Sequence, residues 1–213
     1  MAKPFKNPLI VAVTGGIGSG QSTVCQFLKE WRCKIINADL KAKQVIQKDA
    51  GLKKELRRFF GNDIFLKDGT LNTKRLAELA FRDELSTQKL NRLVHPRMVE
   101  SIIEEMEQAR FSGRYPIIVI DAALIYEISI EQMFDAVIVV NASDKARQKR
   151  VMERDQMSEE EFKARADKQI PLKEKVKWAD FVIDNNGSLE ELKKRTRTVY
   201  DQLMEQVKKA NVN

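Results

Sequence analysis

Hydrophobic residues occur along the chain as short unbroken runs separated by longer stretches with helical spacing. The main runs are "PLIVAV" (8–13), "YPIIVID" (115–121), "FDAVIVV" (134–140) and "ADFVID" (179–184), and a shorter one is "KII" (34–36). Unbroken apolar runs of this length are typical of strands buried on both faces of a sheet. The pattern therefore predicts five strands.

Helical spacing appears directly after the first run, where four residues at i, i+3, i+4 and i+7 form one apolar face. These residues are Val24, Phe27, Leu28 and Trp31. Two Ser-x-x-Glu capping boxes, at 158–161 and 188–191, mark the starts of two later helices. Strands that alternate with helices predict an α/β fold with a parallel sheet covered on both faces.

A long helical block separates the second and third predicted strands. A helix is expected to begin near Leu40, and amphipathic spacing continues from about residue 50 to residue 112. The expected breaks are "FGND" (60–63), "KDGT" (67–70) and "HP" (95–96). Because this block is too long for one crossover, we predict a helical insert at 49–113 within a core formed by 1–48 and 114–213.

The composition suits a globular protein outside the membrane. Of the 213 residues, 43% are apolar and 32% are charged, and no apolar run is long enough to span a bilayer. The start, "MAKPFKNP", has no apolar stretch of signal-peptide length, so we expect a cytoplasmic protein. The two cysteines, Cys25 and Cys33, are too few for a disulfide framework or a metal site, and we expect reduced packing residues.

The net charge of +7 is compatible with nucleic acid or with a polyanionic small molecule. The chain has no run of five or six basic residues, and three Tyr and two Trp offer few stacking platforms. A phosphorylated small molecule is therefore favoured over nucleic acid.

A glycine loop, "GGIGSGQST" (15–23), lies between the first predicted strand and the first predicted helix. It matches the phosphate-binding pattern G-x-x-x-x-G-K-[ST], except that Gln21 stands at the lysine position. Backbone N–H groups of such a loop cradle phosphate oxygens, and Ser22 offers a hydroxyl to Mg²⁺. The expected nucleotide contacts are Gly16, Ile17, Gly18, Ser19, Gly20, Gln21, Ser22 and Thr23. Gln21 is also expected to act in catalysis, because it stands at the position of the loop lysine.

Over nearly its whole length the chain resembles the dephospho-coenzyme A kinase family. The resemblance rests on an ordered set of segments: "TGGIGSGQST", "INADLKAKQV", "LNRLVHPRM", "DAALIYE", "VMERDQMSEEEFKARADKQIPLKEK" and "ADFVIDNNGSLEEL". The loop alone fits many kinases, whereas the set is far more specific. It implies a three-layer P-loop kinase fold with a lid at about 148–175. It also implies Mg²⁺-dependent transfer of the ATP γ-phosphoryl group to the ribose 3′-hydroxyl of dephospho-coenzyme A.

Two acidic residues follow predicted strands, at the sheet edge where ligands bind in α/β folds. The resemblance makes Asp39 the base that accepts the ribose proton, although the first Asp of the family's D-A-D sequence is Asn37 here. The alternative is that Asp39 caps the next helix. Asp121 is a candidate for holding Mg²⁺ through water, and the alternative is a plain strand-end aspartate. Ala123 stands where the family has proline in this segment.

A basic helix is predicted at 143–154, where Arg147, Arg150 and Arg154 share one face at i, i+3 and i+7. From spacing alone, a solvated basic face competes with a phosphate-binding face. The resemblance assigns a catalytic role to Arg150 and nucleotide binding to Arg154, with Arg165 in the lid as a weaker candidate. A lid that closes over ATP would exclude water.

The remaining candidates come from the resemblance. It places "DNNG" (184–187) beside adenine, which would be contacted by Asn185, Asn186 and Gly187; the alternative is a simple turn. The single histidine, His95, is expected to fix a bend between two helices and to line the acceptor pocket. Leu124 and Glu127 are also expected in that pocket.

The substitution at Gln21 leaves three hypotheses open. They are an active dephospho-coenzyme A kinase, a non-catalytic nucleotide- or coenzyme-A-binding relative, and a kinase of another small acceptor. Losing one electrostatic contact of this kind commonly costs about 2.7–4 kcal/mol, or roughly 10²–10³ in rate. The other site residues are retained, which favours the first hypothesis. We expect a monomer, with an oligomer left open.

Overall fold

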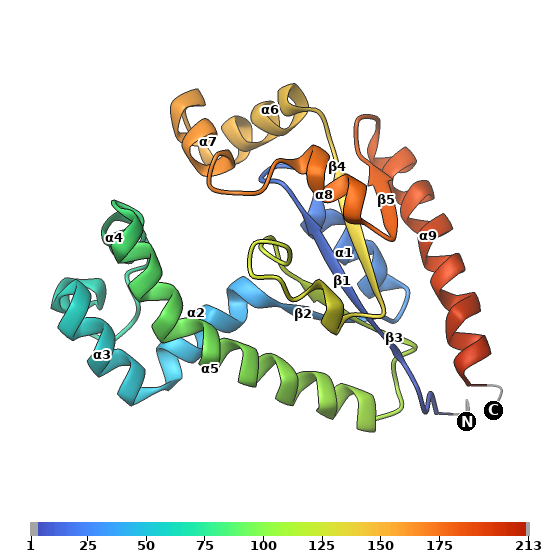
Figure 1. The fold of residues 1–213 in the computed structure, drawn as a ribbon, viewed down its shortest axis with the longest axis horizontal. Coiled ribbons are helices and arrows are strands. Elements are labelled where there is room, and N and C mark those ends of the chain that lie inside the picture. Colours follow the sequence, from blue (N-terminus) through green and yellow to red (C-terminus); the bar gives the residue numbers. More distant parts are fainter. Residues whose placement is uncertain (1–3, 212–213) are drawn as a thin grey trace. The chain divides into compact units, whose positions relative to one another are not determined.

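The computed structural model describes residues 4–211 and contains a five-stranded parallel sheet in the order β2-β3-β1-β4-β5 (Figure 1). The strands are β1 (Leu9–Gly15), β2 (Lys34–Asn37), β3 (Ile117–Asp121), β4 (Ala136–Asn141) and β5 (Phe181–Asp184). All five lie on the predicted apolar runs, so the predicted α/β class and sheet are confirmed.

The strand register brings the carboxyl ends of β1 and β3 to the same edge of the sheet. Val13 of β1 lies beside Asp121 of β3 on one side and beside Ile138 of β4 on the other. Because the strands are parallel, the glycine loop after β1 and the end of β3 share the same edge. Asp121 and the glycine loop are therefore neighbours, as the sequence predicted.

Helices cover both faces of the sheet. Val11 and Val13 face one side, where they pack with α1 (Gln21–Glu30) and α9 (Leu189–Ala210), and these two helices lie side by side (Figure 1). The alternate residue of β1, Ala12, faces the other side and packs with Ile125, Tyr126 and Leu172. Leu172 opens α8 (Leu172–Trp178), a helix that the sequence analysis did not separate from the lid.

Two further helices follow β4. They are α6 (Asp144–Asp155), capped by the Ser143 side chain, and α7 (Glu159–Ala166). Both predicted capping boxes are present, with Ser158 and Glu161 at α7 and with Ser188 and Glu191 at α9. Reciprocal side-chain to backbone hydrogen bonds satisfy the free N–H groups of a helix start, which explains why this local signal is reliable.

The chain divides into two compact units, one comprising the residues up to Ile36 and from Gln108 onward, and the other Asn37–Glu107. The second unit is helical. Its elements are α2 (Ala38–Lys48), α3 (Ala50–Phe60), the short η1 (Asn62–Ile64), α4 (Thr73–Ala80) and most of α5 (Glu84–Phe111). Its core contains Leu52, Leu56, Ile64 and Leu76. The predicted insert at 49–113 covers most of this unit, and its exact boundaries stay a prediction.

The predicted break at "HP" is wrong, because α5 continues through Pro96 without interruption. Proline removes one N–H group and crowds the preceding turn, but a long helix can tolerate it at a cost of about 3 kcal/mol. Buried residues on both sides of the proline, Val94 and Met98, show that both halves are packed. His95 therefore sits inside one helix and does not fix a bend between two.

Among residues 4–211, no helix is long and apolar enough to cross a membrane.

Candidate active site

The glycine loop between β1 and α1 has a backbone shape that side chains would prevent. Gly18 and Gly20 have φ angles of +77° and +96°, in the left-handed region that favours glycine. A Cβ atom on Gly18 would lie 2.5 Å from the Arg147 carbonyl oxygen, and one on Gly20 would lie 2.1 Å from the Asn185 amide nitrogen. The loop is therefore held in a tight curve at the start of α1, which suits a cradle for phosphate.

Gln21, the first residue of α1, turns its side chain toward the sheet edge. Its Nε2 donates hydrogen bonds to the Val13 carbonyl oxygen at 3.0 Å and to Oδ1 of Asp121 at 2.5 Å. Ser22, the next residue, is exposed, and Thr23 closes the first turn by donating its N–H to the Gly20 carbonyl at 3.0 Å. The amide thus joins the loop to the end of β3.

Asp121 is largely buried at the end of β3. Burial, and secondarily the nearby Asp121 carboxylate, raises the pKa of the Cys25 thiol well above its usual value. Burial also raises the pKa of Cys33 to about 12. Both cysteines are free and buried, so they are protonated packing residues at neutral pH.

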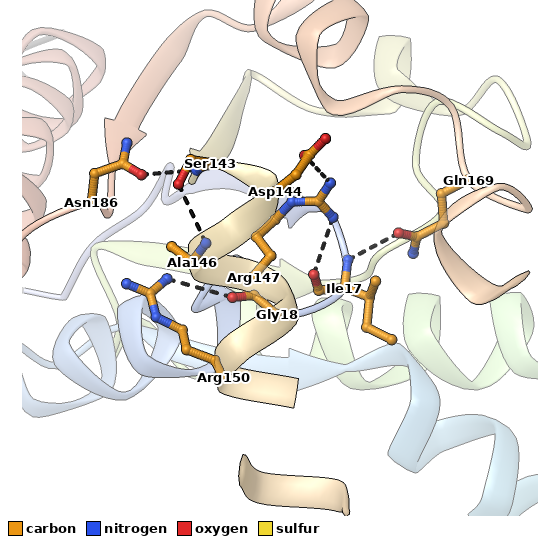
Figure 2. Close-up of polar contacts among 9 residues, drawn as sticks. All are labelled: Ile17, Gly18, Ser143, Asp144, Ala146, Arg147, Arg150, Gln169 and Asn186. Carbon is orange, nitrogen blue, oxygen red and sulfur yellow. Dashed lines mark hydrogen bonds and ion pairs between the residues drawn. The ribbon is translucent and has the colours of Figure 1, made fainter. Parts of the chain in front are cut away.

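Two arginines of α6 extend to the glycine loop and donate hydrogen bonds to its carbonyl oxygens (Figure 2). Arg147 donates from Nη1 to the Ile17 carbonyl at 3.2 Å and from Nη2 to Asp144 at 2.6 Å. Arg150 donates to the Gly18 carbonyl at 3.5 Å and to the Asn185 carbonyl at 2.8 Å. Sequence spacing alone could not distinguish a solvated basic face of α6 from a phosphate-binding one. These contacts show that Arg147 and Arg150 reach the glycine loop.

Arg154, the third arginine on this face, bonds elsewhere. Its side chain is 65% exposed, and the guanidinium donates to Asp155 through two hydrogen bonds of 2.7 Å. Arg165 in α7 is also exposed. Arg154 as a nucleotide-binding residue therefore stays a prediction that requires a change of side-chain partner.

The segment after β5 holds neighbouring loops together. The Asn185 side chain donates to the Ser19 carbonyl at 2.7 Å and accepts from Arg150 at 3.3 Å. The Asn186 side chain accepts from the Ser143 N–H at 2.8 Å. The Asn185 side chain and the Asn186 side-chain oxygen are thus engaged with protein groups. The contact with adenine predicted for residues 185–187 stays a prediction.

A second connection to the loop was not foreseen from the sequence. The Ile17 N–H donates to Oε1 of Gln169 at 3.0 Å, opposite the bond from Arg147 to the Ile17 carbonyl (Figure 2). The next residue, Ile170, donates its N–H to Oε1 of Glu127 at 3.0 Å. The backbone N–H and carbonyl of Ile17 are thus both held by side chains more than a hundred positions away in the sequence.

Glu127 in turn is paired with a lysine that has no exposed side-chain area. Lys175 Nζ lies 2.6 Å from Glu127 Oε1 and donates to the Ala123 carbonyl at 2.8 Å. Burial lowers the pKa of Lys175, while the hydrogen bond and charge of Glu127 act in the opposite direction. The helical spacing of Leu172 and Lys175, both buried on α8, is the sequence signal that could have identified this lysine.

The Ala123 carbonyl also accepts from the Thr14 hydroxyl at 3.1 Å, so the turn with alanine in place of the family's proline is tied to β1. Leu124, the next residue, is 40% exposed.

The other predicted site residues lie in the second unit. Asp39 is exposed in the first turn of α2, and the helix is capped by the Asn37 side chain, which accepts from the Leu40 N–H at 2.8 Å. The alternative that Asp39 is the cap is therefore wrong. His95 is half-buried in α5, and burial lowers its pKa below the usual 6.5.

Comparisons with known proteins agree with this architecture. The family model described as dephospho-CoA kinase matches residues 9–191. A dephospho-CoA kinase of Listeria innocua is 36% identical over 194 residues, covering 91% of this chain and 96% of the relative. A solved structure from Thermus thermophilus has a TM-score of 0.78 at 32% identity, covering 92% of this chain and 98% of its own. The dephospho-CoA kinase from Campylobacter jejuni gives 0.63 at 27% identity, covering 92% and 97%.

Proposed function

Because the chain belongs to the dephospho-coenzyme A kinase family, we propose that it transfers the γ-phosphoryl group of ATP to the 3′-hydroxyl of dephospho-coenzyme A, giving coenzyme A and ADP. The chain is a kinase that acts on a small molecule. The finer assignment is supported above all by the family match, which runs from β1 through the glycine loop and the helical unit into α9.

The residues of the loop fit the phosphates of ATP. Glycines at 16, 18 and 20 bring backbone close to the neighbouring chain, and the loop opens a helix whose N-terminal N–H groups favour an anion. Ser22 and Asp121 would hold Mg²⁺, with Asp121 acting through water. Bound Mg²⁺ would neutralise charge on the β- and γ-phosphates. Residues 4–211 contain no cluster of three or more His, Cys, Asp or Glu suited to a metal, which fits an ion held largely by substrate and water.

On the acceptor side, Asp39 would take the proton from the ribose hydroxyl as that oxygen attacks. His95 and Leu124 would each contact the acceptor. Glu127 would act mainly by holding the Ile170 N–H and Lys175 in place. Arg150 would stabilise charge on the transferred group, and Arg154 would bind nucleotide after leaving Asp155.

The test is a coupled assay of ADP formation with ATP, Mg²⁺ and dephospho-coenzyme A. We expect turnover by the native chain and a loss of about 10²-fold or more in kcat for Asp39→Asn, with ADP affinity retained. Glu84→Gln, which removes an exposed acid from the first turn of α5, is the matched control. Absence of turnover with intact nucleotide binding would instead support a non-catalytic nucleotide- or coenzyme-A-binding relative.

A further inference from the structure

The phosphate loop carries no cation of its own. Residues 15–23 contain neither lysine nor arginine, and Gln21 stands where the usual lysine would reach the β- and γ-phosphates. The Gln21 amide is engaged with Val13 and Asp121. An amide can donate hydrogen bonds but cannot neutralise phosphate charge. Apart from Mg²⁺, positive charge at these phosphates must therefore come from side chains on other elements.

The side chain of Arg147, from α6, lies beside Gly16 and Ile17 of the loop. Its Nη1 is 3.2 Å from the Ile17 carbonyl oxygen and would be 2.7 Å from a Cβ atom on Gly16. The guanidinium can lie there because residue 16 is glycine. Its side chain is only 8% exposed, although α6 is otherwise strongly polar.

The charge of Arg147 is only weakly compensated by protein groups. Its carboxylate partner, Asp144, is 87% exposed, and ion pairs with such exposed groups are weak. The other contacts are a carbonyl and the ring of Phe162, 5.6 Å away, and Nε is buried without a hydrogen-bond partner among residues 4–211. Arg147 is therefore a nearly buried cation beside the loop whose carboxylate partner is open to solvent.

We propose that Arg147 contacts the nucleotide phosphates and supplies the positive charge that Gln21 withholds from the loop. This inference rests on the proposed function and adds a phosphate-binding residue that the sequence comparison did not assign. On binding, the guanidinium would leave the exposed Asp144 for a phosphate, one anionic partner for another. Gln21 and Arg147 then act as a pair, with the hydrogen-bonding role and the charge on different elements.

The test is a double-mutant cycle between the two positions, made with the full chain. Arg147→Gln is expected to lower kcat by about 10²–10³-fold in the native background. In a Gln21→Lys background the same change should cost less than about tenfold, because the loop lysine restores the charge. Gln21→Lys alone should change kcat by less than about tenfold, since the native chain already has its cation. Lys149→Gln, which removes an exposed charge from the same helix, is the control and should have no effect.

Nucleotide affinity gives a readout that does not depend on turnover. Arg147→Gln should weaken ADP binding by about 10–100-fold and leave adenosine binding unchanged, and Gln21→Lys should restore ADP binding. Arg147→Lys keeps the positive charge and should bind ADP better than Arg147→Gln. If Arg147→Gln does not fold, the ADP affinity of Arg147→Lys relative to the native chain serves as the test.

An equal loss in both backgrounds would show that Arg147 only shapes the loop and would overturn the inference. A gain of about 10²-fold from Gln21→Lys alone would do the same, because it would mean that no other residue supplies the charge. If the native chain binds ADP through Arg147 but transfers no phosphate, the proposed function fails and the inference stands.

Discussion

The side-chain amide of Gln21 donates a hydrogen bond of 2.5 Å to the Asp121 carboxylate, across the edge between α1 and β3. A lysine at this position would bring a positive charge to the same edge of the sheet. The neutral amide places no positive charge beside the carboxylate. This agrees with the proposal that Asp121 holds a hydrated Mg²⁺ at the phosphate loop.

Asp121→Asn tests this role directly. Removing the carboxylate charge is expected to raise the Mg²⁺ concentration needed for half-maximal rate by about 10–100-fold, as for other residues that act on a metal through its outer shell. The measurement is a Mg²⁺ titration of kinase activity at saturating ATP. ADP binding in EDTA should change little. Glu190→Gln, an exposed acid on α9, serves as the control, and an unaltered Mg²⁺ requirement in Asp121→Asn would contradict the assignment.

Gly20→Ala should disrupt the loop by a steric mechanism. The new Cβ would lie 2.1 Å from the Asn185 amide nitrogen, which would have to leave the Ser19 carbonyl. We expect loss of measurable ADP binding by calorimetry and a lower unfolding temperature. The matched control is Gly69→Ala, since Gly69 also has a positive φ, of +80°, but has nothing within 4 Å of the added atom. That change should cost about 1–2 kcal/mol of stability and leave ADP affinity intact. Equal effects on ADP affinity would rule out the steric account.

Lys175→Met should be strongly destabilising, because it leaves the partly buried Glu127 carboxylate without its 2.6 Å partner. Breaking a buried pair in this way costs about 3–5 kcal/mol, measured by urea unfolding. Lys175→Met combined with Glu127→Gln should recover much of this loss, since the new side chain is neutral and can still accept from the Ile170 N–H.

The contrast for this pair is Lys177→Met on the same helix. Lys177 is 64% exposed and lies 2.8 Å from Glu174, so its loss should cost less than about 1 kcal/mol. Similar costs for Lys175→Met and Lys177→Met would mean that burial of the first pair has no energetic consequence.

His95 gives a pH-dependent signal, and it is the single histidine of the chain. Burial lowers its pKa in the folded protein, so between the folded value and about 6.5 the unfolded chain binds more protons. Stability should therefore fall as the pH decreases from about 6.5 toward the folded value, and His95→Gln should remove this component. The imidazole resonances in an NMR titration should show a midpoint below 6.5. A midpoint above 6.5 would contradict the burial argument.

The fold was largely predictable because its signals are local. A strand buried on both faces needs an unbroken apolar run, and a capping box satisfies N–H groups within four residues. The predicted helix break at Pro96 was wrong because proline's tendency to end a helix is a local effect. Packing of residues on both sides of the proline holds α5 together. Helix α2 begins at Ala38, and not near Leu40 as expected, because the Asn37 side chain caps it.

The site was predictable only in part. Glycine spacing identified the loop, but same-face spacing could not distinguish Arg147 and Arg150, which reach the loop, from Arg154, which bonds to its neighbour. That difference depends on where α6 meets the loop. The bond from Ile17 to Gln169 joins residues 152 positions apart, and no local pattern encodes such a contact.

The two outermost strands of the sheet, β2 and β5, are only four residues long. An edge strand of this length exposes about two outward-pointing N–H groups and as many carbonyls, too few to template a further strand. The long apolar strands β1, β3 and β4 are enclosed between neighbours. A sheet whose most hydrophobic segments are all internal has a built-in protection against edge-to-edge aggregation, even though those segments would be prone to aggregate in an unfolded chain.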